Sequence, residues 1–197
     1  HSNVSVEANK RAEAAKQQLA QRQRIGEQKH TQQVQALWTK ALPLTHAQAG
    51  VARTYLAQRG IGTSNAVLAQ IAAGDAIRFH PALAYYSAVA HEEITAHGEV
   101  VIKERIVVLG HYPAIVTAIR DENGDIATLH RTYLSPDGAK AEVEHPRKML
   151  GLPDSKTVTG GAIPLAMPRG ILGVAEGLET ALAAYTSTRL PTWSCVS

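Results

Sequence analysis

The sequence predicts an α+β fold, with N-terminal helices, an antiparallel, hairpin-rich middle and the start of a parallel α/β unit at the end. Three observations lead to this class. Up to about residue 74, apolar residues recur at helical spacing. From about residue 77 to 134 the apolar period is nearer two, which is typical of half-buried strands. Residues 171–196 then follow the order strand, helix, strand, with which a parallel sheet begins.

Four helices are expected before the strands begin. Residues 4–29, rich in Ala, Gln, Glu, Lys and Arg, predict one long, exposed and mildly basic helix. We interpret it as a solvated linker, with a nucleic-acid-contacting arm and a coiled-coil contact as alternatives. A second helix is expected over 31–42, ended by Pro43. A third helix over 45–59 and a fourth over 64–74 follow, with N-caps at their first residues.

The middle of the chain predicts strands joined by tight turns. Segments 99–109, 114–120 and 126–134 are rich in Val, Ile, Thr and Tyr, which favour strands. The Glu-Asn-Gly-Asp run at 122–125 supplies the turn of a hairpin between the last two segments. The Ser-Pro-Asp-Gly run at 135–138 predicts a second turn.

The C-terminal part predicts a parallel unit. The continuous apolar run at 171–175 predicts a strand buried on both faces. A helix is expected over 178–188 and a second strand over 191–196. Two parallel strands do not complete a domain, so we expect the chain to end inside one. The expected division is 1–44 as a helical lead-in, 45–160 as an α+β region and 161–197 as an incomplete α/β unit.

Composition limits the class of protein. Of 197 residues, 45% are hydrophobic and 19% charged, which excludes a wholly disordered chain. No apolar run approaches the ~18 residues that span a bilayer, and one cysteine excludes a disulfide scaffold and a cysteine-based zinc site. We therefore expect a cytoplasmic protein without a membrane partner. The net charge of +3 permits a polyanionic partner without requiring one.

The strongest candidate for chemistry is the run LGVAEGLETALAA at 172–184. Glu176 follows a parallel strand, and ligands of α/β sheets bind at the carboxyl ends of such strands. A carboxylate there suits Mg²⁺ or the work of a general base; the alternative is a capping or solvated acid. Gly177 would let the backbone turn tightly and approach a phosphate. Glu179 falls in the first helical turn, where it favours the helix dipole.

The same run resembles the opening of a Toprim domain, in particular that of primases from plasmids, phages and integrative elements. Further segments follow in the order that this family shows: YLAQRGI (55–61), YPAIVTAIRDENGDIATLHRTYLSPDGAKA (112–141), RKMLG (147–151) and GGAIPLA (160–166). The resemblance covers roughly residues 45–197. It makes 161–197 the beginning of a Toprim unit and 45–160 a primase-associated region.

The resemblance implies DNA primase activity, a nucleotidyl or phosphoryl transfer on single-stranded DNA that uses Mg²⁺, or Mn²⁺. It makes Glu176 the catalytic acid and metal ligand. The expected partners are single-stranded DNA and nucleotides, with replication or conjugation proteins besides. The family carries a later Asp-x-Asp that supplies metal ligands, and no such pair follows Glu176 here. Several carboxylates must converge on the metal in such chemistry, so we expect this polypeptide alone to be inactive.

A group of cations forms the second candidate site. Four of them lie around the predicted turn at 135–138 and are candidates for phosphate contacts: Arg131, Lys140, Arg147 and Lys148. The alternative is a solvated strand edge whose lysines prevent aggregation. Strand alternation sends His130 and Thr132 to one face and Arg131 and Tyr133 to the other, so the group cannot all contact one ligand.

Zinc and thiol chemistry are not expected. The histidines of HEEITAH at 91–97 lie six residues apart, which does not place them on one helical face, and we interpret this segment as a polar loop. No other ligand spacing for zinc occurs. Cys195 is expected to be a buried structural thiol. The functional alternative to a primase is a non-catalytic nucleic-acid-binding or interaction module of a relaxase or conjugation protein.

Overall fold

The computed structural model describes residues 2–195 of the chain. The elements, in chain order, are α1 (Ser2–Lys40), η1 (Ala47–Ala49), α2 (Gly50–Ala57), α3 (Asn65–Ala73), β1 (Ile77–Ile94), β2 (Val100–Arg120), β3 (Ile126–Tyr133), β4 (Arg147–Met149), β5 (Ala162–Pro164), β6 (Gly173–Ala175), α4 (Leu178–Thr188) and β7 (Thr192–Cys195). The fold is α+β, as the sequence predicts.

One seven-stranded sheet organises the molecule. Its order is β4-β3-β2-β5-β7-β6, with β1 paired to β2. All pairings are antiparallel except β6 with β7, which are parallel and joined through α4. The predicted hairpin joins β2 to β3, and Asp121 accepts hydrogen bonds from the Asn123 and Asp125 amides in its turn. The expected strand–helix–strand unit is therefore present at the end of the described chain.

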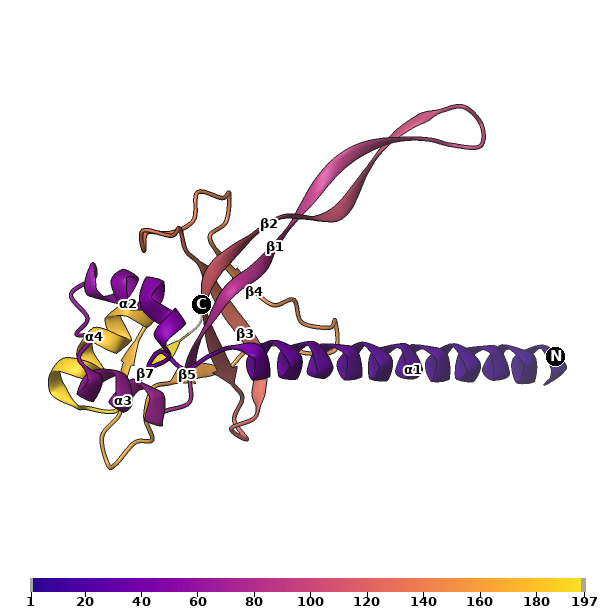
Figure 1. Cartoon of the computed structure of the whole chain (residues 1–197). Coiled ribbons are helices and arrows are strands. Elements are labelled where there is room, and N and C mark those ends of the chain that lie inside the picture. Colours follow the sequence, from indigo (N-terminus) through magenta and orange to yellow (C-terminus); the bar gives the residue numbers. More distant parts are fainter. Residues whose placement is uncertain (1, 196–197) are drawn as a thin grey trace.

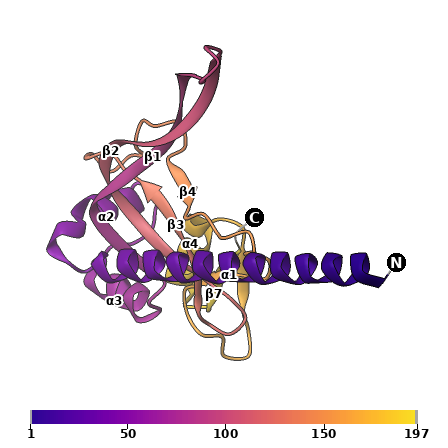
Figure 2. The ribbon, with the colours of Figure 1, turned by 90° about the vertical axis from the view of Figure 1, so that its right-hand side faces the viewer.

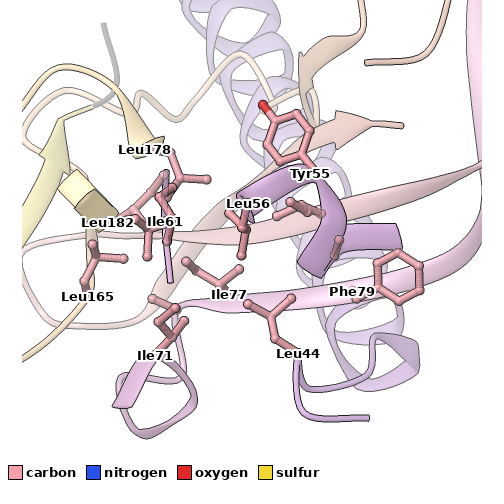
Figure 3. Close-up of a cluster of buried hydrophobic side chains, with 14 of the residues drawn as sticks. Leu44, Tyr55, Leu56, Ile61, Ile71, Ile77, Phe79, Leu165, Leu178 and Leu182 are labelled. Carbon is pink, nitrogen blue, oxygen red and sulfur yellow. The ribbon is translucent and has the colours of Figure 1, made fainter. Parts of the chain in front are cut away.

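The sheet carries a hydrophobic core on each face. Helices α2, α3 and α4 pack on one face, where Leu56, Ile71 and Leu182 meet Ile115 and other strand residues (Figures 1 and 3). The C-terminal part of α1 packs on the other face, through Val34 and Trp38. Alternate residues of the β2 segment Ala114–Ile119 serve the two cores, which explains why the whole segment is buried.

The two helices expected over 4–29 and 31–42 are one continuous helix, α1. His30, at the expected break, is buried, and its ring nitrogen Nε2 lies 2.8 Å from the Ala127 carbonyl. The helix thus continues from solvent onto the sheet without interruption. No helix in residues 2–195 combines the length and the apolar character needed to cross a bilayer.

Strand β1 and the outer half of β2 form a long hairpin that projects from the body (Figures 1 and 2). The apolar period of two indicated strand character from about residue 77, but no strand was assigned over 77–94, where Pro81 and the polar run at 91–93 interrupt the pattern. Pro81 falls in a register shift between His80 and Leu83, which removes the need for its missing amide. The interpretation of 91–97 as a polar loop is wrong for residues 91–94, which extend β1.

Two expectations about burial are wrong. The run 171–175 was expected to be buried on both faces, yet Ile171 and Val174 are 66% and 64% exposed, because β6 is the outermost strand of the sheet within residues 2–195. Cys195 was expected to be buried and is exposed. In β7 the buried face holds Thr192 and Ser194, so Cys195 lies on the open face.

Candidate nucleic-acid interface

An open cavity of about 850 Å³ lies at the N-terminal end of α4, on the face of the sheet that also carries α2 and α3. It is lined by His130, Thr132, Arg147, Met149, Ile163, Val174, Ala175, Glu176, Gly177, Leu178, Glu179, Thr180, Ser194 and Cys195. The parallel strands β6 and β7 end at this cavity. This is where an α/β sheet places its ligands, and both glutamates of the EGLET run lie there.

Glu176 lies at the carboxyl end of β6, exposed to the cavity. Its backbone carbonyl accepts a 3.4 Å hydrogen bond from the Ser194 hydroxyl, which ties the end of β6 to β7. Within residues 2–195 its carboxylate takes part in no hydrogen bond or ion pair. Glu176 is thus an acid with free oxygens at the position where the sequence predicts one.

Gly177 is the N-cap residue of α4, and its φ of −105° is one that any residue adopts. A Cβ built there would meet only the Thr180 hydroxyl, at 3.8 Å. The turn itself therefore does not require a glycine. The close approach of a phosphate to this backbone stays a prediction.

Glu179, one turn into α4, is the acid that the fold engages. Its Oε1 accepts a hydrogen bond from the Arg147 guanidinium of β4 at 2.5 Å and another from the Tyr55 hydroxyl of α2. Arg59 Nε lies 3.9 Å from the same oxygen, and the guanidinium of Arg59 stacks 3.5 Å from the centre of the Tyr55 ring. Figure 3 shows the Tyr55 hydroxyl pointing away from the aliphatic cluster. One carboxylate thus links α2, β4 and α4.

The interactions within this cluster favour the ionised form of Glu179. Burial alone would raise the pKa of Glu179, but the hydrogen bond from Tyr55, the backbone hydrogen bond and the charge of Arg147 together lower it. Burial, followed by the hydrogen bond to Glu179, raises the pKa of Tyr55. Burial works against the charge of Arg147, yet its bonds to Tyr55 and Glu179 raise its pKa. Arg147 and Glu179 therefore form a charge-assisted pair at the cavity wall.

The four predicted cations divide between the two faces of the sheet. Arg147 lines the cavity, whereas half-buried Lys140 is not among the lining residues; burial and the charge of Arg147 both lower the pKa of Lys140. Arg131 and Lys148 form a cross-strand pair on the opposite face. Both make structural contacts there, because Arg131 donates to the Met149 carbonyl and Lys148 to the Tyr86 carbonyl, each at 2.8 Å. Of the four, Arg147 is the one that lines the cavity.

His130 of β3 lines the cavity, on the face of the sheet that strand alternation predicts. Burial, reinforced by the charge of Arg147, lowers the pKa of His130 to about 4, although Glu179 acts in the opposite direction. The imidazole is therefore neutral near pH 7. At that pH it contributes a hydrogen-bonding group to the cavity and no positive charge.

Sequence reasoning missed Tyr55 and Arg59 as members of the site. Tyr55 lies in α2 and Arg59 just after its end; their four-residue separation within the helix predicted over 45–59 was a weak signal that they act together. Nothing local indicates that this face meets residues 147 and 179. Sequence reasoning also assigned Glu179 only to the helix dipole, because its partners come from elements far away in the chain.

The cavity does not by itself supply a complete metal site. No group of three or more His, Cys, Asp or Glu side chains suited to a metal ion occurs within residues 2–195. Glu176 offers free oxygens, whereas Glu179 is held by Arg147 and Tyr55. Mg²⁺ binds through one or two carboxylates together with waters and substrate phosphates. The described residues therefore supply at most part of such a site.

Fold and cavity together define an α+β protein whose parallel βαβ unit ends at a cavity walled by paired acidic and basic side chains. The chain belongs to the family described as Domain of unknown function (DUF7146), whose model matches residues 28–160. A search of curated proteins finds no match.

The fold is similar to that of a solved structure titled "Structure of the DnaG primase catalytic domain bound to ssDNA", with a TM-score of 0.53 and 17% sequence identity. The likeness covers 89% of this chain and 57% of that one, so the chain spans a little over half the length of its structural neighbour. At this identity, the likeness shows a shared fold.

Proposed function

We propose that this chain is part of a primase-like protein of a mobile element, and that its cavity binds single-stranded DNA and nucleotides. In this proposal Arg147 and Lys140 contact the phosphates, and Arg59, beside Glu179, adds positive charge nearby. The observation that carries the proposal is the Arg147 guanidinium at the wall of a cavity onto which a parallel βαβ unit opens. A guanidinium presents a planar set of donors that matches a phosphate.

Two further observations support the proposal. The fold is similar to that of a DnaG primase catalytic domain whose structure contains single-stranded DNA. The ordered segments that resemble Toprim primases include RKMLG and the EGLET run, which supply Arg147, Glu176 and Glu179. The fold likeness and the motif resemblance therefore both support a primase-like function.

Catalysis belongs to the complete protein in this proposal. Magnesium would supply charge neutralisation to a nucleotidyl transfer, and Glu176 is the residue of this chain that would hold it or accept a proton. Three other residues need no metal for their proposed roles: Arg147 and Lys140 contact phosphates, and neutral His130 accepts or donates a hydrogen bond.

The second candidate is a non-catalytic nucleic-acid-binding module of a relaxase or conjugation protein. It is favoured by the engagement of Glu179 with Arg147 and Tyr55, which removes one carboxylate from metal chemistry. This module would bind DNA without Mg²⁺. Glu176→Gln would leave its affinity unchanged, whereas the primase proposal expects DNA binding to depend on Mg²⁺ and on Glu176.

The test measures binding of a fluorescent single-stranded oligonucleotide by anisotropy across a salt series. Arg147→Ala should weaken binding about equally for all sequences and reduce the salt slope by about 0.7 per lost phosphate contact. Lys148→Ala is the matched control, because this neighbour in the same strand lies on the opposite face. Equal losses in the two variants, or no binding by the unaltered chain, would contradict the proposal.

A further inference from the structure

The β1–β2 hairpin extends beyond the body as a two-stranded arm formed by residues 84–94 and 100–111 (Figures 1 and 2). After a register shift between Tyr85 and Tyr86, its strands pair without interruption from Tyr86–Val108 to Ile94–Val100, and Gly98 in the turn has a φ of +80°. Isolated two-stranded ribbons are marginally stable in water. An arm of this length is therefore expected to contact something.

One face of the arm is apolar and bare. Paired residues of an antiparallel ribbon share a face, and the even-numbered residues of both strands pair with each other here. This face carries six large apolar side chains, each between 47% and 76% exposed: Tyr86, Ile94, Val100, Ile102, Ile106 and Val108. Contiguous exposed apolar surface of this kind marks an interaction site.

The charges on this face are all negative. Glu92 and Glu104 lie on it, and neither makes an ion pair within residues 2–195. The cations Lys103 and Arg105 lie on the opposite face, where Lys103 Nζ is 2.8 Å from Glu93. The two glutamates on this face would repel a nucleic acid or an anionic lipid surface. Its partner must combine apolar contact with positive charge.

Within the described residues, the N-terminal part of α1 is a second long projection. Residues 9–25 of this helix are exposed on every side. They include five Lys or Arg residues and one Glu, together with Leu19 and Ile25, which are 58% and 44% exposed. Helix and arm leave the body in diverging directions (Figures 1 and 2), so they do not cover each other within one molecule.

We propose that the apolar face of the arm binds helix α1 of a second copy of this chain, in a reciprocal dimer. Leu19 and Ile25 would contribute apolar contact, and the cations Lys16 and Arg22, each three residues from Leu19 along the helix, would lie beside Glu92 and Glu104. The lengths are compatible, since residues 9–25 of the helix span about 25 Å and fit along an 11-residue strand, which spans about 36 Å.

Area and charge favour this arrangement over pairing of two arms. A ribbon two strands wide offers a face of only a few hundred Å², whereas a stable interface buries roughly 800 Å² per partner. A reciprocal contact uses an arm and a helix from each copy and so doubles the area, and a two-fold axis closes it. Two stacked arms would also bury four glutamates without cations.

Sedimentation velocity of residues 1–197 across a concentration series tests the dimer. Ile102→Ser should raise the dimer Kd at least about tenfold. Val101→Ser is the matched control, because this neighbouring residue lies on the opposite face and should change it little. Lys16→Glu with Arg22→Glu should also weaken the dimer, and adding Glu92→Lys with Glu104→Lys should restore it. Circular dichroism checks that each variant is folded.

Three results would overturn the proposal. The unaltered chain could remain monomeric at every concentration, or become dimeric only when DNA is added, which would assign α1 to nucleic acid. A dimer that responds to Ile102→Ser but not to the helix substitutions would show pairing of arms. Restoration by the charge swap supports the arm–helix contact. These readouts do not depend on the cavity, so they fail or succeed separately from the proposed function.

Discussion

Glu179 of α4 and Arg147 of β4 form an ion pair with 2.5 Å between Oε1 and Nη2, although 32 residues separate them in the chain. The pair lies at the wall of the cavity, with the Tyr55 hydroxyl on the same carboxylate oxygen. Glu176, three residues earlier, faces the same cavity without a partner in residues 2–195. Two glutamates of one motif thus occupy different environments.

This difference predicts unequal effects on stability. Glu179→Gln removes the charge that Arg147 and Tyr55 face, and we expect the free energy of unfolding to fall by about 1–2 kcal/mol. Glu176→Gln alters an exposed acid and should change it by less than about 0.5 kcal/mol. Urea denaturation at pH 7 measures both. Similar losses in the two variants would mean that the ion pair contributes nothing specific.

The same substitution should affect DNA binding in the opposite direction. Glu179→Gln removes a negative charge from the cavity and leaves Arg147 free to face a phosphate. We expect affinity for single-stranded DNA to rise about two- to fivefold at low salt, an effect of less than about 1 kcal/mol. Fluorescence anisotropy measures it. A weaker complex would show instead that Glu179 is needed to hold Arg147 in its binding position.

We predict that the folded protein loses stability in mild acid because of His130. Its pKa falls from 6.5 to about 4 on folding, chiefly because it is buried. Between these values the unfolded chain binds more protons, so stability decreases as the pH falls. We expect His130 to contribute about 2 kcal/mol less at pH 5 than at pH 7.

The comparison for this prediction is the variant His130→Gln, measured by urea denaturation at both pH values. Its stability should change less between pH 7 and pH 5 than that of the unaltered chain. Glu179 acts mainly below this window, since its own pKa is lowered. An unchanged pH dependence in the variant would assign the effect to other groups.

We predict that substitution by alanine lowers stability to different extents at two turn glycines. Gly138 and Gly124 have φ values of +83° and +84°, where any side chain is strained. At Gly138 a Cβ would lie 2.6 Å from Thr54 Cγ2 of α2, whereas at Gly124 it would meet nothing within 4 Å. We expect Gly124→Ala to cost about 1 kcal/mol and Gly138→Ala more, roughly 2–3 kcal/mol. Thermal unfolding compares them, and equal costs would contradict the packing of α2 against this turn.

Local patterns predicted much of the secondary structure. Helical spacing indicated α2, α3 and α4, and alternation with turn residues indicated the β2–β3 hairpin. The break between the first two helices was wrong, and β1 was missed. In both cases a tertiary contact or a bulge outweighed the local signal, at His30 and Pro81 respectively.

The sequence by itself determined the α+β class, the position of Glu176 after a parallel strand, and the separation of His130 from Arg131 by strand alternation. These properties depend on neighbours within a few residues, which spacing reveals. Only the tertiary structure decided that Tyr55, Arg147 and Glu179 meet, that Lys148 faces away from the cavity, and that one face of the arm is bare. Such properties depend on contacts between distant segments, and no local pattern encodes which segments will pack together.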